Sequence, residues 1–264
     1  MRTTLQLSAF LIFAFLFQSF WGYAQSKKFG EYQMKEFDFQ GRNAKIVFPE
    51  KANEARNWIW RARFWGHEPQ TDLALLEKGF HVVYVDVANL YGNAEAVNIW
   101  NNFYEYLVEK YNLNTKAVLE GMSRGGLIIY NWAAENTDKV FSIYADAPVC
   151  DIKSWPGGLY KGKGSPADWE RCLKAYNLDS KSAKHFKGIP VYTSVKVAKA
   201  GIPVIHVCGD ADDVVPLKEN TLKFARQFKC AGGKIELIVK EGVNHHPHSL
   251  EDPQPIVDFI LDSL

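Results

Sequence analysis

The sequence has little that would mark the chain for a specialised partner. Its 264 residues carry 31 basic and 30 acidic side chains, so the formal net charge is only +1. Without a charge excess the chain has no strong attraction for phosphate backbones, and we expect no nucleic-acid partner. No internal repeat and no low-complexity linker interrupts the sequence. A composition that is 47% hydrophobic and 23% charged instead predicts one globular domain with a substantial core.

Long apolar runs are also scarce, and the one that occurs lies at the start of the chain. Arg2 precedes an uninterrupted apolar run over 9–17, and Gly22-Tyr23-Ala24 offers the small residues that a signal peptidase reads. The run is short for a membrane span, and no cysteine follows it that could carry a lipid. We therefore expect 1–24 to be a signal peptide, with an uncleaved anchor as the alternative. The mature chain, 25–264, should be secreted or periplasmic, without a stable membrane anchor.

Cysteine is sparse, with four residues in the chain. Cys208 lies in an apolar strand pattern and Cys230 near the end of a helical pattern, so both are expected to be buried thiols. Cys150 and Cys172 fall in an irregular region, where a disulfide could join loops of an exported protein. The sequence leaves the pairing of these four open.

Strand patterns and helix patterns alternate along most of the chain. Eight strands are expected, at 34–40, 44–49, 58–63, 81–88, 116–121, 140–146, 202–208 and 234–240, the first two joined by a hairpin turn at 41–43. Helices are expected at 70–79, 94–111, 126–135, 217–230 and 253–264. This alternation predicts the α/β class, with a mostly parallel eight-stranded sheet flanked by helices and with functional groups at the carboxyl ends of the strands.

One serine stands in a distinctive setting. Gly121-Met122-Ser123-Arg124-Gly125 lies between an apolar strand pattern and a helical stretch, which places Ser123 on a tight strand-to-helix turn. The two glycines suit such a turn because a side chain at either position would collide with the neighbouring strand or helix. The pentapeptide alone arises by chance too often to identify a function.

Two polar segments downstream supply possible partners for Ser123. The first follows strand 202–208 and contains three aspartates, Asp210, Asp212 and Asp213. The second follows strand 234–240 and contains three histidines, His245, His246 and His248. A serine hydroxyl is a poor nucleophile at neutral pH, so a histidine must remove its proton, and a carboxylate must fix the tautomer of that histidine. The order serine, acid, histidine therefore favours acyl transfer through Ser123.

In these motifs the chain resembles the α/β-hydrolase superfamily, over nearly everything after residue 30. The resemblance implies an α/β-hydrolase fold in which the irregular segment, about 150–199, forms a small cap over the pocket. The acid of the family stands in a Gly-x-x-Asp-x-x-Val-Pro setting, which implies Asp212, with Asp213 and Asp210 as alternatives. The family's histidine follows a Gly-x-x segment, which favours His245 over the two other histidines.

An oxyanion hole is expected beside the serine. One donor should be the backbone N–H of Arg124, at the start of the following helix. The second should come from the loop after strand 58–63, with Phe64 or Arg63 as the candidate. The chain lacks a His-Gly-Gly-Gly loop at this place and has Phe64-Trp65-Gly66-His67 instead.

The histidine-rich segment could also be a metal site, because imidazole is a common zinc ligand. Adjacent histidines in an extended chain point to opposite faces, however, and the proline between His246 and His248 limits their convergence further. We therefore expect no metal and no cofactor. His206, inside an apolar strand pattern, is expected to be a core histidine.

Arginines near the expected pocket suggest an acidic substrate. Arg61, Arg63 and Arg124 belong to segments that meet at the site, and arginine suits bidentate capture of a carboxylate. The alternative is that Arg61 and Arg63 pair with acids of the body, such as Asp86 or Asp146. An acidic substrate would be an ester of an acidic sugar or of an aromatic acid.

Arg63, His67 and Trp155 are the candidates for substrate contacts. Trp155 leaves the strand that follows the serine helix and should border the substrate. Its ring could stack on a sugar face, or it could wedge the cap against the body, and the sequence does not choose between these roles.

Together these observations predict a secreted serine hydrolase, an esterase that acts on carbohydrate-linked esters through an acyl-enzyme. Its partner would be a small-molecule or oligosaccharide ester. One alternative is a small serine peptidase of the prolyl-oligopeptidase type, although such peptidases usually carry an N-terminal propeller that this sequence lacks. Another is a catalytically silent hydrolase-fold protein that binds a glycan.

Overall fold

The computed structural model describes residues 27–264, so the expected signal peptide and its cleavage site lie outside the described residues. In chain order the strands are β1 (Lys27–Phe29), β2 (Tyr32–Phe39), β3 (Arg42–Phe48), β4 (Trp58–Arg61), β5 (His81–Val85), β6 (Ala117–Met122), β7 (Val140–Asp146), β8 (Val204–Gly209) and β9 (Ile235–Lys240). The α-helices are α1 (Gln70–Glu77), α2 (Ala94–Tyr111), α3 (Gly125–Glu135), α4 (Pro166–Tyr176), α5 (Ser180–Ala183), α6 (Pro190–Thr193), α7 (Val195–Lys199), α8 (Thr221–Cys230) and α9 (Gln254–Leu261). Two short 3₁₀ helices, η1 (Ala88–Leu90) and η2 (Thr137–Lys139), complete the elements. Within 27–264 no helix combines the length and the hydropathy needed to cross a bilayer.

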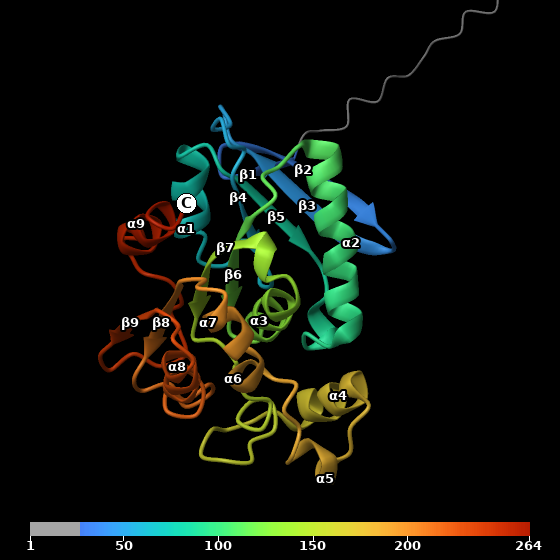
Figure 1. Cartoon of the computed structure of the whole chain (residues 1–264), viewed down its shortest axis with the longest axis vertical. Helices are drawn as coiled ribbons and strands as arrows, with labels where there is room; N and C mark the ends of the chain where they lie inside the picture. The colour runs from blue at the N-terminus through green and yellow to red at the C-terminus, as the bar shows by residue number, and fades with distance from the viewer. Residues whose placement is uncertain (1–26) are drawn as a thin grey trace, which may run out of the picture.

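A single mixed sheet runs through the molecule in the order β1-β2-β3-β5-β4-β6-β7-β8-β9 (Figure 1). The strands from β5 to β9 are parallel, whereas β1, β2 and β3 pair antiparallel at one edge. The expected α/β class and mostly parallel sheet are confirmed. The sheet has nine strands rather than eight, because the three residues of β1 pair with β2 and are too few to show a pattern in the sequence.

The opening hairpin turns earlier than expected. β2 ends at Phe39 and β3 begins at Arg42, so the turn is Gln40-Gly41 rather than 41–43. Both turn residues have positive φ, 54° and 78°, as a two-residue loop between antiparallel strands requires.

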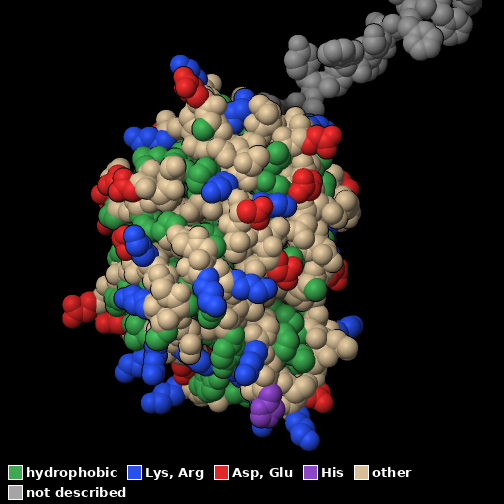
Figure 2. All heavy atoms as spheres, in the orientation of Figure 1, with side chains coloured by type: hydrophobic (Ala, Val, Ile, Leu, Met, Phe, Trp, Pro, Cys, Tyr) green, Lys and Arg blue, Asp and Glu red, His purple; other side chains and the backbone are tan. Residues whose placement is uncertain are grey.

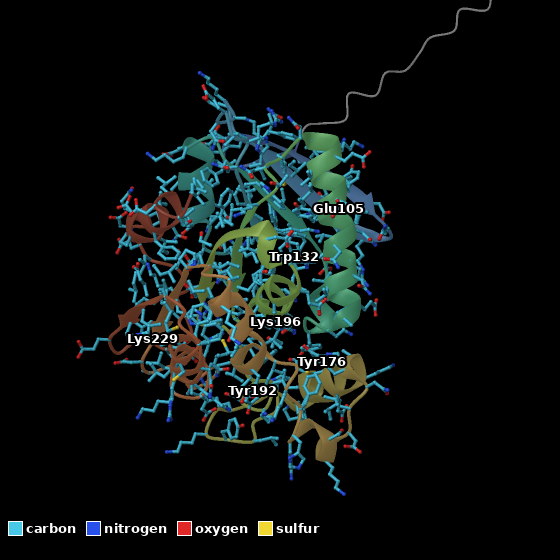
Figure 3. The ribbon with its side chains drawn as sticks, viewed as in Figure 1. Glu105, Trp132, Tyr176, Tyr192, Lys196 and Lys229 are labelled. Carbon is cyan, nitrogen blue, oxygen red and sulfur yellow. The ribbon has the colours of Figure 1, made fainter. Side chains whose placement is uncertain are left out.

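Helices cover both faces of the sheet. α1 and α9 lie together on one face, where their apolar residues pack against β5, β7 and β8 (Figure 1). α2, α3 and α8 cover the other face. This second layer is rich in tryptophan: the rings of Trp60 on β4 and Trp100 on α2 stack at 3.9 Å. Trp132 of α3 packs edge-on against Trp60 and lies between the helices in Figure 3.

The segment 150–199, expected to be irregular, contains the four helices α4 to α7. Three of them have only four or five residues, too few for a helical periodicity to appear in the sequence. α4 and α5 lie at the end of the molecule where the carboxyl ends of the central strands point (Figure 1). Tyr176 of α4 and Tyr192 of α6 mark this region in Figure 3.

All four cysteines are free thiols. Cys150, Cys172 and Cys208 are buried, so the expectation for Cys208 is confirmed and the possible bridge between Cys150 and Cys172 is not formed. The expectation for Cys230 was wrong: it is the last residue of α8, and it is exposed.

Figure 2 shows acidic and basic side chains interspersed over one face of the molecule, as the near-zero net charge leads us to expect. Acidic side chains interrupt the basic ones on this face, so it lacks the continuous positive surface that would attract a polyanion.

His206 is the core histidine that its apolar strand predicted. It is fully buried in β8, with Nε2 2.6 Å from the Tyr130 hydroxyl and Nδ1 3.0 Å from Thr221 Oγ1. Burial lowers the pKa of His206 to about 3, because the charged ring would lose its hydration without gaining a carboxylate.

This lowered pKa predicts a specific acid sensitivity. Between pH 6.5 and about 3 the unfolded chain binds a proton at His206 and the native protein does not. The free energy of unfolding should therefore fall as the pH is lowered, by about 1.4 kcal/mol per pH unit at most from this group. In urea unfolding at pH 7 and pH 4.5, His206→Gln should lose less stability than the wild type, by on the order of 1–3 kcal/mol.

His185→Gln is the matched control, because His185 is exposed and should leave the wild-type pH dependence unchanged. Equal losses for the wild type and His206→Gln would show that the native protein protonates His206 without cost.

Candidate active site

Ser123 occupies the strained turn that its sequence predicted. It follows β6, precedes α3 and has φ of +49°, a left-handed conformation that is rare for any residue but glycine. Its N–H donates to the Asp146 carbonyl at 2.8 Å, which holds the turn against β7. A Cβ added at Gly121 would lie 2.7 Å from Ile129 Cδ1, so the expected collision there is confirmed.

The second steric constraint lies one residue later than expected. A Cβ at Gly125 would meet Arg63 Cβ at 3.4 Å, which is ordinary contact, so the expected collision at Gly125 was wrong. At Gly126 it would lie 2.7 Å from Pro148 Cβ and 2.8 Å from the Val149 carbonyl oxygen. The start of α3 therefore packs against the chain after β7 through Gly126.

Ser123, Asp212 and His245 lie in one hydrogen-bonded line. His245 Nε2 is 3.0 Å from Ser123 Oγ, and His245 Nδ1 is 2.7 Å from Asp212 Oδ2. All three residues are buried, with exposed fractions of 6–8%. Loops after β6, β8 and β9 carry them, so the carboxyl ends of three parallel strands bring together residues more than 120 positions apart.

The environment of Asp212 favours its charged form. Burial would raise its pKa, but the hydrogen bond and the charge of His245 lower it below its ordinary value. The N–H groups of Val214 and Val215 donate to Asp212 Oδ1 at 2.9 and 2.8 Å and act in the same direction. Asp212 is therefore an anion that can fix the tautomer of His245.

The two alternative aspartates are engaged elsewhere. Asp210 Oδ1 accepts the Gly242 N–H at 2.7 Å and so joins the loop after β8 to the loop after β9. Asp213 forms an exposed ion pair with Lys163 at 2.7 Å.

Two backbone N–H groups are available for an oxyanion. Phe64 has φ of +52°, and its carbonyl accepts from Arg61 Nε at 3.2 Å and from the His67 N–H at 3.0 Å. The N–H groups of Phe64 and Arg124 donate to no backbone carbonyl among residues 27–264. The structure thus leaves both proposed donors free beside Ser123.

Arg61 does not face the pocket. It is 1% exposed, and its guanidinium bonds Asp72 on α1, Glu120 on β6 at 3.0 Å and the His67 carbonyl. The substrate contact expected for Arg61 was therefore wrong. The alternative, pairing with acids of the body, is confirmed, although the partners are Asp72 and Glu120 rather than Asp86 or Asp146. Burial raises the pKa of Glu120 well above its ordinary value, although the charge of Arg61 opposes this.

A cavity of about 360 Å³ opens over the serine. Its lining consists of Phe64, Trp65, His67, Ser123, His245, His246 and His248. His67 thus lies at the site as expected. Trp65 also lines the cavity, although its sequence context predicted no role for it beyond membership of the same loop.

The histidines converge, whereas the alternation of an extended chain and the proline between His246 and His248 predicted little convergence. β9 ends at Lys240, so the alternation of an extended strand does not apply to the segment that follows. The rings of His246 and His248 lie 4.8 Å apart, and His67 joins them from the loop after β4 at 5.8 Å from each. The nitrogen atoms of these three residues that could hold a metal all lie within 4.8 Å of one another.

Asp146 is a site residue that the sequence reading did not identify. Its Oδ1 lies 2.6 Å from His248 Nδ1, and its Oδ2 accepts the Ser249 N–H at 2.8 Å and the Tyr144 hydroxyl at 3.0 Å. A carboxylate inside an apolar strand was the available signal, because such a group is rarely buried without a partner.

Trp155 is buried and does not belong to the lining of the serine cavity. Its ring packs 5.1 Å from the Arg124 guanidinium, which also lies 5.9 Å from the Phe64 ring. Of the two roles expected for Trp155, the structure therefore favours the contact that wedges the segment 150–199 against the body of the protein.

Arg124 forms an ion pair with Asp168 of α4 at 3.3 Å, and Asp168 also binds the Tyr91 hydroxyl and Arg171. Burial opposes ionisation of Asp168, but these hydrogen bonds lower its pKa to about 2.

Arg63 lies 5.0 Å from the Phe64 ring and has no acidic partner within 4.0 Å in the part of the chain that the structure describes. Positive charge is therefore in excess near Phe64.

Residues 84–264 match the prolyl oligopeptidase family, peptidase family S9. No curated protein matches the sequence. Among solved structures, Est1E from Butyrivibrio proteoclasticus is 20% identical with a TM-score of 0.59, over 87% of this chain and 98% of that one. The S-formylglutathione hydrolase from Agrobacterium tumefaciens is 14% identical with a TM-score of 0.59, over 88% of this chain and 92% of that one.

The Pyrococcus horikoshii acylaminoacyl peptidase is 16% identical with a TM-score of 0.60, over 81% of this chain. The chain spans only 37% of the length of that peptidase. At these identities the likeness shows that this chain has the same α/β-hydrolase fold as the three solved structures.

The two glycines after Ser123 allow a matched test of the turn. Gly126→Ala should lower the free energy of unfolding by about 1–3 kcal/mol, because its Cβ meets atoms that cannot move away. Gly125→Ala should change it by less than about 1 kcal/mol, since its Cβ has room and alanine favours the helix. Urea unfolding of both variants would check this, and the reverse order of stabilities would contradict it.

Proposed function

The chain belongs to the prolyl oligopeptidase family (S9), and from this we propose that it is a serine esterase that cleaves carbohydrate-linked esters through an acyl-enzyme. Membership of this family identifies the chain as a hydrolase. One observation supports Ser123, Asp212 and His245 as the catalytic residues. His245 lies between the other two, with Nε2 3.0 Å from Ser123 Oγ and Nδ1 2.7 Å from Asp212 Oδ2.

The arrangement suits a two-step reaction. His245 Nε2 takes the proton of Ser123 as Oγ bonds to the ester carbonyl carbon, and Asp212 stabilises the resulting imidazolium. The N–H groups of Arg124 and Phe64 would hold the oxyanion. When the ester C–O bond breaks, His245 returns the proton to the leaving alcohol. A water molecule activated by His245 then attacks the acyl-enzyme, which releases the acid and restores Ser123.

The surroundings of the cavity support an ester with a flat or acidic group. Phe64 and Trp65 line the cavity, and aromatic rings suit contacts with a sugar face or an aromatic acid. Arg63 and Arg124 flank Phe64, and Arg63 has no acidic partner among residues 27–264. We therefore include an acidic sugar or an aromatic acid in the proposed substrate class, with Arg63 and His67 as contacts and Trp155 acting by supporting Arg124.

Peptide hydrolysis is the second candidate, and the family match is the observation that favours it. The same three residues would attack an amide carbonyl, and His245 would then protonate an amine rather than an alcohol.

Export to the periplasm or beyond also remains a proposal, which rests on the apolar run and small residues within 1–24. The N-terminal sequence of the mature protein would test it, since cleavage after Ala24 leaves Gln25 first.

Single substitutions should separate the base from its neighbour. Hydrolysis of p-nitrophenyl acetate should fall roughly 10⁴-fold or more in Ser123→Ala and in His245→Ala, because each removes a group that the chemical step needs. His246→Ala should retain most of kcat, since His246 is exposed and outside the line from Ser123 to Asp212. A fluorophosphonate probe should label the wild type and fail to label Ser123→Ala.

Circular dichroism of each variant would establish that it is folded. Undiminished turnover in folded His245→Ala would remove His245 as the base, and glycan binding without serine labelling would indicate a silent binding protein.

A substrate panel should distinguish the two candidate activities. Acetylated, feruloylated and methyl-esterified oligosaccharides should have kcat/KM values above those of blocked peptide amides if the esterase proposal holds. Arg63→Ala should lower kcat/KM for an ester that carries a free carboxylate at least tenfold more than for its neutral analogue, because a charged hydrogen bond contributes about 1.5–3 kcal/mol. Arg63→Lys tests whether charge alone suffices. Faster cleavage of the peptides would favour the peptidase.

A further inference from the structure

Three histidines meet on one wall of the serine cavity, and the hydrolytic reaction proposed above uses none of them as its base. His67 comes from the loop after β4, and His246 and His248 come from the loop after β9. Their ring planes are nearly perpendicular in each pair, at 80–85°. Rings in this arrangement do not stack on one another, and one nitrogen of each ring lies within 4.8 Å of a nitrogen of each of the other two.

His248 is oriented as histidine ligands of metals are. Its Nδ1 lies 2.6 Å from the buried carboxylate of Asp146, which accepts the hydrogen on Nδ1, so in the neutral ring the lone pair lies on Nε2. A carboxylate behind a histidine in this way orients the ring and makes its other nitrogen a better donor to a cation. Asp146 is itself held by the Ser249 N–H and the Tyr144 hydroxyl. The least exposed of the three rings is thus fixed before any ligand arrives.

His67 stands on an equally well-fixed backbone. Its carbonyl accepts from the buried guanidinium of Arg61, and its N–H donates to the Phe64 carbonyl at 3.0 Å. The imidazoles of His67 and His246 are exposed, so they can rotate while their backbones stay in place. Zinc–nitrogen bonds of about 2.0–2.1 Å in a tetrahedron separate the nitrogens by about 3.4 Å, so the widest pair must close by roughly 1.4 Å. Rotation of an exposed imidazole about χ1 and χ2 covers that distance.

His245 is not available as a fourth ligand. Its two ring nitrogens already face Ser123 Oγ and Asp212 Oδ2. A cation held by the other three histidines would lie in the same cavity as Ser123 and leave the hydrogen-bonded line intact.

We propose that His67, His246 and His248 form a three-histidine site for a late first-row divalent cation such as Zn²⁺, on the wall of the cavity that contains Ser123. Three neutral imidazoles suit zinc, cobalt, nickel or copper, whereas calcium and magnesium require oxygen ligands that these residues do not offer. The fourth position of the cation faces the cavity and is open to water or to an oxygen of a substrate. The site does not depend on the proposed esterase activity.

Metal binding is the direct test. The full chain without a polyhistidine tag, stripped with EDTA and dialysed, should bind one equivalent of Zn²⁺ in isothermal titration calorimetry, with a micromolar or lower Kd. Co²⁺ should give the intense visible absorption of a tetrahedral site. His67→Ala and His246→Ala should each weaken binding roughly tenfold or more, and both residues are exposed, so neither change should disturb the fold.

Two controls make the result specific. His185→Ala removes an exposed histidine outside the cavity and should leave the affinity for Zn²⁺ unchanged. Ser123→Ala should bind Zn²⁺ as the wild type does, so a failure of hydrolysis and a failure of metal binding can be told apart. A wild-type Kd in the millimolar range, or equal affinities in the wild type and the His67→Ala/His246→Ala double variant, would overturn the proposal.

Discussion

The buried guanidinium of Arg61 holds together the part of the molecule on which the site depends. It bonds Asp72 on α1, Glu120 on β6, and the carbonyls of Phe64 and His67 in the loop between β4 and α1. Burying a charge is costly unless it is paired and hydrogen-bonded, and removing one partner of such a cluster leaves a charge that water cannot reach. The loop therefore has one conformation in which all of these bonds are made. In that conformation the Phe64 N–H is left without a backbone acceptor and His67 reaches the cavity wall.

A second buried charged residue, Asp146, stabilises the loop that carries the histidines, as Arg61 stabilises the loop after β4. The carboxylate of Asp146 binds His248 and the Ser249 N–H, while the carbonyl of the same residue accepts the N–H of Ser123. One residue at the end of β7 thus fixes both the strained serine turn and the loop that carries His245. Arg61 and Asp146 lie on opposite sides of the β6 strand that leads to the serine, and each stabilises one of the loops that line the cavity.

The sequence predicted those features that depend on local pattern, and it failed where distant charges decide. Strand and helix periods located eight of the nine strands, and the Gly-x-Ser-x-Gly turn located the serine, because these signals lie within short windows. The partners of Arg61 could not be read in this way, since Asp72 and Glu120 become its neighbours only when α1 and β6 pack against β4. The divergence of the histidines was inferred from the alternation of a strand, and that rule does not hold in a loop. Helices as short as α5 and α6 carry no period that a sequence could reveal.

The roles of the histidines follow from the groups that contact their ring nitrogens. His245 and His248 each have a buried carboxylate at Nδ1, at 2.7 and 2.6 Å, so the lone pair of each neutral ring lies on Nε2. The Nε2 of His245 faces a serine hydroxyl, which makes it suited to accept a proton, whereas His248 belongs to the cluster with His67 and His246, which is suited to bind a cation. The same carboxylate–histidine unit thus occurs twice in one cavity, and its chemistry is set by the atom that each ring faces. Residue type alone cannot distinguish the base from the ligand, because the decisive contacts come from β6 and from the loop after β4.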